Sequence, residues 1–134
     1  MSTPYAFTVE LAQPIGPAMD TLRAALAAEQ MGIVSEVDVQ ATLKAKLGLD
    51  SPPARLVGVC SPRIAHQLMS IDPDIAALLP CGCGVSELAP GRTRIALQDP
   101  RMIAAASGTA EVAEAVEEVR AALERVAARL REGG

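Results

Sequence analysis

The sequence contains very few aromatic residues and a single histidine. Tyr5 and Phe7 are its only tyrosine and phenylalanine, tryptophan is absent, and His66 is the one histidine. The core must therefore be built from Ala, Val, Leu, Ile and Met. Such a core offers no aromatic platform on which a base or a planar cofactor can stack. The sequence indicates no organic cofactor.

The chain also lacks an excess of positive charge. Its formal net charge is -4 and its pI is about 5.0, with no run of lysines or arginines. A negative protein repels a phosphate backbone, so we expect no nucleic-acid partner.

Export and membrane signals are missing as well. The first residues show no basic start followed by an apolar run, and no segment approaches the roughly 18 apolar residues of a spanning helix. We expect a soluble cytoplasmic protein with no membrane partner. Three cysteines without an export signal do not suggest a disulfide framework, so we expect reduced thiols.

What is present is a regular alternation of strand and helix patterns in a chain of one-domain length. Apolar and polar residues alternate over residues 5–11, with Tyr5, Phe7, Val9 and Leu11 on one face, which predicts an opening strand. The same reading predicts strands over residues 33–39, 52–60, 81–88 and 92–98, the last two as a hairpin. Helical spacing predicts helices over residues 17–31, 62–70, 73–79 and 100–107, from residue 109 onward, and a short one within residues 38–50 that Gly48 ends.

Three of these helix starts carry the same signal, a capping oxygen before a proline, in Ser61-Pro62, Asp72-Pro73 and Asp99-Pro100. The pattern predicts a single α+β domain over residues 1–134, with a mixed β-sheet of about five strands covered by helices.

Two of the predicted helices have an apolar stripe. In residues 38–50 the stripe is Val39, Leu43 and Leu47, which we expect to be buried. In the long amphipathic C-terminal helix it consists of Val112, Val116, Val119, Leu123, Val126 and Leu130. That stripe favours packing on the sheet, and a dimer seam is the alternative.

The stretch LLPCGCGVSE is the main candidate for chemistry. In a strand, Cys81 and Cys83 lie on one face, while Gly82 and Gly84 leave the other face bare. Their Cα atoms are then about 6.6 Å apart with parallel Cβ directions, which opposes a disulfide. Two such thiolates can instead share a soft metal ion. The bare glycine face permits close approach by a helix or a second subunit.

Cys60 is the natural third thiol, because its strand is expected to pair with the strand of Cys81. It precedes the predicted helix start at Ser61, and Arg63 lies in the first turn, so both features favour its thiolate form. His66 lies about one turn into that helix and is a candidate fourth ligand or proton acceptor.

Three segments, SEVDVQATLKAKLGLDSPP, LVGVCSPRIAHQLMSIDPDIAALLPC and QDPRMI, resemble in order and spacing a prokaryotic family, domain of unknown function 302. The resemblance extends from about Phe7 to Leu123. The usual Cys-Asn-Pro of the family is Cys-Ser-Pro here at residues 60–62, and its Pro-Cys is present at residues 80–81. Cys83 departs from the family pattern. The resemblance implies a compact α+β domain, a homodimer, and no established activity.

Three hypotheses follow for the cysteines. In the first, Cys60, Cys81 and Cys83, with His66 nearby, form a soft-metal site for Cu(I) or Zn(II). Alternatively, Cys60 or Cys81 is a thiol redox group or a persulfide carrier of sulfur. In the third, the cysteines are inert packing residues of a structural or interaction domain. The spacing matches no established zinc motif, and no catalytic triad is visible, so the sequence does not favour an enzyme.

Overall fold

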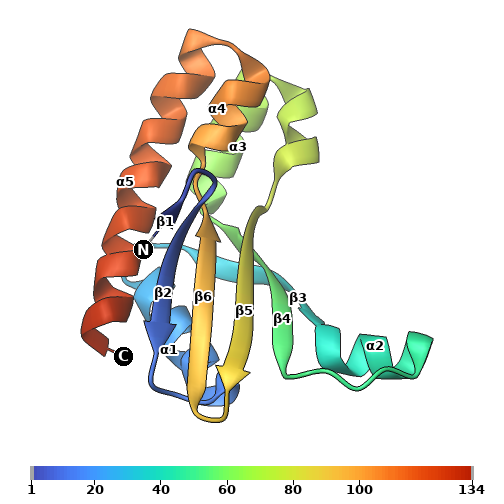
Figure 1. The fold of residues 1–134 in the computed structure, drawn as a ribbon. Coiled ribbons are helices and arrows are strands. Elements are labelled where there is room, and N and C mark those ends of the chain that lie inside the picture. Colours follow the sequence, from blue (N-terminus) through green and yellow to red (C-terminus); the bar gives the residue numbers. More distant parts are fainter. Residues whose placement is uncertain (1, 134) are drawn as a thin grey trace.

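The computed structural model describes residues 2–133 and has a six-stranded sheet at its centre (Figure 1). The strand order is β1-β2-β6-β5-β4-β3. The strands are β1 (Ser2–Thr3), β2 (Ala6–Leu11), β3 (Gly32–Asp38), β4 (Ala54–Cys60), β5 (Cys81–Ala89) and β6 (Arg92–Gln98). The helices are α1 (Ile15–Ala27), α2 (Val39–Leu47), α3 (Pro62–Ile71), the 3-10 helix η1 (Pro73–Leu78), α4 (Arg101–Ser107) and α5 (Ala110–Gly133). The predicted α+β class and long C-terminal helix are confirmed.

The expectation of a mixed sheet was wrong, because all the strand pairings of the described residues are antiparallel. An antiparallel neighbour returns from the same end of the sheet and needs no helix crossing a face. The segment between β3 and β4 therefore places α2 beyond the end of the sheet. The predicted hairpin of β5 and β6 is confirmed. Tyr5 is not in the strand and is 60% exposed.

The core lies between one face of the sheet and the helices α1, α3 and α5. In Figure 1, α1 lies behind the sheet and α5 runs along its β2 side. The apolar stripe of α5 is fully used in this core, with exposed fractions of 7% or less for Val112, Val116, Val119, Leu123, Val126 and Leu130. Packing within the chain, which the stripe favoured, is confirmed. No helix of residues 2–133 covers the opposite face of the sheet at Gly82 and Gly84.

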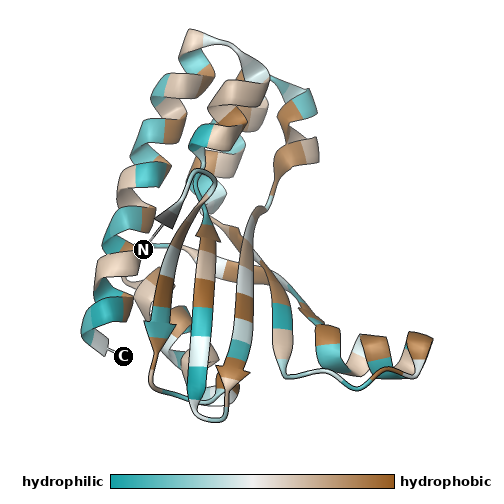
Figure 2. Cartoon of the chain, viewed as in Figure 1, coloured by the Kyte–Doolittle hydropathy of each residue, from teal (hydrophilic) through white to brown (hydrophobic). Residues whose placement is uncertain are grey.

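The predicted burial of the α2 stripe was wrong. The helix has well-formed ends, since the Asp38 Oδ1 accepts a hydrogen bond from the Ala41 N–H at 2.9 Å and Gly48 ends it at φ 66°. None of its residues is buried, and Leu47 is 64% exposed. Figure 2 shows α2 projecting from the body of the molecule with hydrophobic segments along it. Because none of its residues is buried, no part of the described chain covers α2. A nine-residue helix is marginally stable without such packing.

The helix starts behave differently from one another. The Asp72 Oδ1 accepts a hydrogen bond from the Asp74 N–H at 3.0 Å, and the Asp99 Oδ1 accepts one from the Arg101 N–H at 3.0 Å. The side chain of Ser61 makes no capping bond to α3. Among the described residues, no helix is both long and apolar enough to cross a membrane.

Candidate functional site

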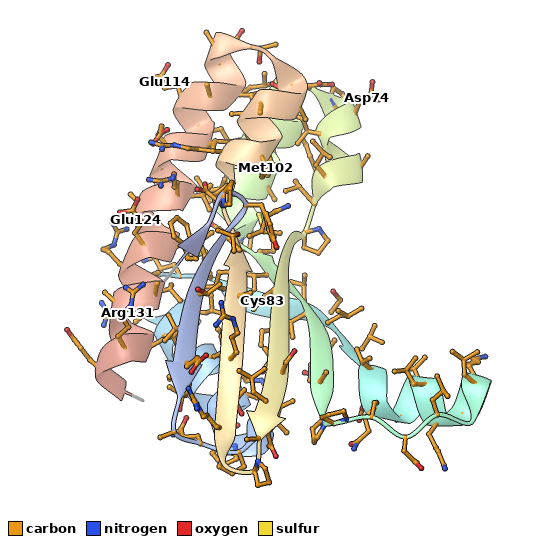
Figure 3. The ribbon with its side chains drawn as sticks, viewed as in Figure 1. Asp74, Cys83, Met102, Glu114, Glu124 and Arg131 are labelled. Carbon is orange, nitrogen blue, oxygen red and sulfur yellow. The ribbon has the colours of Figure 1, made fainter. Side chains whose placement is uncertain are left out.

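Cys81 and Cys83 lie on the core face of β5, as the alternation predicted. Their exposed fractions are 8% and 4%, and Val85 beyond them is fully buried. The three cysteines are free thiols. In Figure 3, Cys83 lies on β5 near the middle of the sheet.

The assumed neighbourhood of the Cys60 and Cys81 strands is confirmed, because β4 pairs with β5. Val59, and not Cys60, lies directly opposite Cys81 in that pair. Cys60 comes one residue later, at the end of β4, where its cross-strand partner is Gly32 of β3. Cys60 is half-buried.

Cys60 and Cys81 nevertheless line the same small cavity of about 20 Å³ beneath α3. The remaining lining is almost wholly apolar, from Met31, Val59, Ser61, Ile64, Ala65, Leu68, Leu79, Ile103, Val119 and Leu123. Cys83 is not part of this lining. The structure thus brings Cys60 and Cys81 to one cavity. Cys83 lies two residues further along β5.

His66 is not near the thiols. Ile64 and Leu68 form the buried side of α3, and His66 lies about 200° around the helix from Ile64 because successive residues turn by about 100°. It is exposed and lines a separate surface hollow with Glu111 and Glu114 of α5. Within residues 2–133, no three His, Cys, Asp or Glu side chains are placed to hold one metal ion.

Burial raises the pKa of all three thiols. The pKa of Cys83 rises to about 12 through desolvation. The pKa of Cys81 rises to about 11 through desolvation and, second, through the charge of a neighbouring Cys60 thiolate. Desolvation also raises the pKa of Cys60. The expectation that the helix start and Arg63 would favour the Cys60 thiolate is therefore not met. Arg63 is engaged instead in an ion pair with Glu118 of α5.

A cleft of about 450 Å³ adjoins the thiol cavity. The two share Met31, Ser61, Ile64 and Val119 in their linings. The cleft walls also include Arg125, whose Nε lies 2.7 Å from the Glu29 Oε1. No sequence motif indicated this cleft, because its walls come from the turn after α1, the start of α3 and the middle of α5. The positive φ of 59° at Gln30, which also lines it, is not readable from residue type.

The bare face of the sheet forms a second feature, an apolar groove of about 420 Å³. The "open-face groove" is lined by Tyr5, Ala6, Leu56, Val57, Gly82, Cys83, Gly84, Ala96, Gln98 and Met102. A Cβ atom added to Gly82 or Gly84 would meet nothing within 4 Å, so no part of the described chain approaches these glycines. The Gln98 Oε1 is buried there without a hydrogen-bond partner among the described residues.

The fold and the thiol pair together define a small α+β domain with two cysteines at one apolar cavity. The chain belongs to the family described as domain of unknown function DUF302, whose family model matches residues 7–130. The resemblance seen in the sequence is confirmed, and the match begins at Phe7 as predicted and ends at residue 130, beyond the predicted end near Leu123.

A solved structure supports the fold assignment. It is the crystal structure of an uncharacterized conserved protein DUF302 from Bacillus stearothermophilus, which is 24% identical to this chain. The alignment covers 96% of this chain and 100% of that chain, with a TM-score of 0.86. At this identity the similarity establishes the fold alone. No curated protein matches the chain.

Proposed function

We propose that the protein is a thiol-based module that binds one Cu(I) ion between the sulfur atoms of Cys60 and Cys81. The observation that supports the proposal is the shared cavity, since Cys60 and Cys81 both line one small apolar space. The other two candidate ligands, Cys83 and His66, do not line it. Thiolate sulfur selects soft ions such as Cu(I), and Cu(I) can be coordinated by two ligands without a bound water.

The identity of the ion follows from the number of ligands. Structural Zn(II) sites take four protein ligands and catalytic ones three. The described residues offer no such set. The almost wholly apolar lining of the cavity also suits an ion that carries no hydration water. We therefore favour Cu(I) over Zn(II).

The raised pKa values favour a metal site over a nucleophilic thiol. With a pKa of about 11, Cys81 is ionised in only about one molecule in ten thousand at pH 7, so it reacts slowly as a nucleophile. A metal ion overcomes the same penalty, because it displaces the proton and offsets the charge of the thiolate.

A second candidate is a reversible Cys60–Cys81 disulfide. Val59 lies directly opposite Cys81, so the Cα atoms of Cys60 and Cys81 are separated by about 6 Å. That value falls within the usual range for disulfides, roughly 4.4–6.8 Å, and the bond also requires Cys60, which follows Val59 at the end of β4, to turn its side chain toward the face of Cys81. The disulfide would form by exchange with a low-molecular-weight disulfide, which leaves as two thiols.

Metal retention tests the first candidate. Reduced protein is loaded with Cu(I) without oxygen and examined by native mass spectrometry under competition from a weak chelator. The wild type should retain one Cu(I), and Cys60→Ser and Cys81→Ser should each lose it. Cys83→Ser and His66→Ala are the matched controls and should retain it. Failure of the wild type to retain Cu(I), or equal losses in all four variants, would contradict the proposal.

The same samples separate the two candidates. If the wild type retains no Cu(I) but forms an intramolecular Cys60–Cys81 bond when mixed with a low-molecular-weight disulfide, the second candidate replaces the first. The mass spectrum of a cysteine-alkylated digest identifies which thiols are bridged.

The proposal places the protein in the cytoplasm, where thiols stay reduced and accessible to Cu(I). We also propose that it acts as a homodimer. Within residues 2–133, two apolar surfaces are left uncovered, α2 and the open-face groove. A two-fold dimer buries both surfaces, since α2 of each subunit can pack across the glycine face of the other.

Charge substitutions test the dimer. Leu56 in the groove and Leu88 near the β5–β6 turn are similarly exposed, at 60% and 52%. Leu56→Glu should shift the sedimentation equilibrium toward the monomer, while Leu88→Glu should leave it unchanged. A wild type that sediments as a monomer at all concentrations would contradict the dimer.

A further inference from the structure

A pocket of about 460 Å³ lies where the final turns of α5 reach the outer side of β2. Its lining is Thr8, Val9, Glu10, Arg92, Arg94 and Arg131. In Figure 3, Arg131 lies near the end of α5 beside β2. This "arginine pocket" is separate from the thiol cavity and from the open-face groove, and nothing argued so far uses it.

The pocket holds three guanidinium groups and a single carboxylate, Glu10, which two of the three share. The Arg92 Nη2 lies 2.6 Å from the Glu10 Oε2, and the Arg94 Nη1 lies 3.1 Å from the Glu10 Oε1. Both oxygens of Glu10 are thus occupied. Arg131 has no carboxylate within 4.0 Å among the described residues. The lining therefore carries a formal charge of +2.

This local charge departs from the rest of the molecule, whose net charge is -4. Every other arginine in residues 2–133 has a carboxylate partner within 4.0 Å. Arg131 is the exception, and it faces the same pocket as two arginines that share one acid. Gathering like charges costs free energy unless an anion neutralises them.

Arg92 and Arg94 lower the pKa of Glu10 through hydrogen bonds and charge, with Arg92 the larger influence. Glu10 therefore stays ionised at neutral pH and competes with any anion that enters. It also holds the two guanidinium groups in place with N–H donors left over. Guanidinium presents five N–H donors in a planar fork that matches phosphate oxygens.

We propose that the arginine pocket binds a phosphate group of an anionic ligand, held by Arg92, Arg94 and Arg131. A phosphate carries about two negative charges at neutral pH, which balances the charge of the lining. The same group is found on soluble phosphorylated compounds and on phosphoinositide lipids, so the experiment includes both sources.

The soluble source is tested by titrating the full chain with inorganic pyrophosphate in an isothermal calorimeter at low salt. Binding should saturate. Arg131→Gln should weaken it by about tenfold, the loss expected for one charge-assisted interaction. Arg129→Gln is the matched control. It removes the same charge two residues before Arg131, and Arg129 pairs with Glu29. It should change the affinity less than twofold.

Glu10 provides the opposite test. Glu10→Gln should strengthen pyrophosphate binding several-fold, because it removes the competing carboxylate and leaves an acceptor for the arginines. Glu132→Gln removes the same charge from the neighbourhood of Arg131 without touching the lining, and it should have little effect.

Co-sedimentation with phosphatidylcholine vesicles that contain phosphatidylinositol phosphate tests the lipid source. Binding to these vesicles without binding of pyrophosphate in the calorimeter, if Arg131→Gln abolishes it, assigns the phosphate to a lipid. The proposal is overturned if neither probe binds, if Arg129→Gln weakens binding as much as Arg131→Gln, or if Glu10→Gln weakens it.

Discussion

Replacing Cys83 with valine should make the protein less sensitive to alkali. Cys83 is 4% exposed, and its pKa rises from 9.0 to about 12 because burial disfavours the thiolate. The folded state therefore holds a proton that the unfolded state releases above pH 9. The stability contributed by this neutral thiol is complete below pH 9 and is lost as the pH rises toward 12.

The magnitude follows from the size of the shift. Each pH unit in this interval removes about 1.4 kcal/mol from the free energy of unfolding, so about 3 kcal/mol is lost between pH 9 and pH 11. Valine is a somewhat larger apolar side chain with no proton to lose. Any constant packing difference between the two side chains cancels when the variant and the wild type are compared at two pH values.

The assay is urea unfolding of both proteins at pH 8 and pH 11 with a reductant present. The stability advantage of Cys83→Val over the wild type should grow by about 3 kcal/mol between the two pH values. The contribution of Cys81 is common to both proteins and cancels in the comparison. A difference that stays constant within about 0.5 kcal/mol would show that the Cys83 thiol is not desolvated and would reopen its role as a metal ligand.

Two further changes test the packing that holds the site. Gly58→Ala should destabilise the protein by about 1–3 kcal/mol in urea unfolding, because the new Cβ would lie 2.6 Å from the Pro80 Cγ. Gly82→Ala, whose Cβ meets nothing within 4 Å, is its control, and equal effects would refute the stated contact. Leu123→Ala should cost about 2–5 kcal/mol, because Leu123 is 1% exposed in the core and lines the thiol cavity. A change in thermal midpoint no larger than that of an exposed-leucine variant would contradict this.

Most of the elements were predictable because local periodicity carries them. Alternation placed Cys81 and Cys83 on one face of β5, and a sheet with one buried face must hide that set together. The stripe of α5 predicted burial because its repeat matches the helical turn. The sequence pattern of α2 looked similar, yet that helix is exposed. Its stripe specifies only which side is apolar and not whether a partner lies opposite.

The candidate site was only partly predictable. His66 was wrongly grouped with the thiols because its sequence distance from Cys60 is short, while its angle around α3 points it elsewhere. The arginine pocket was missed, since Glu10, Arg94 and Arg131 come from three elements far apart in the chain. No local pattern records that they meet.

The sequence by itself determined the α+β class, the order of the elements and the common face of Cys81 and Cys83, because these depend on repeats of two or about four residues. Only the tertiary structure decided that Cys60 meets Cys81 at a cavity and that Cys83 lies outside it. It also decided that α2 stands free and that three arginines converge. Each of these depends on strand register and on the docking of helices, where one residue of shift or one turn of rotation changes which side chains meet.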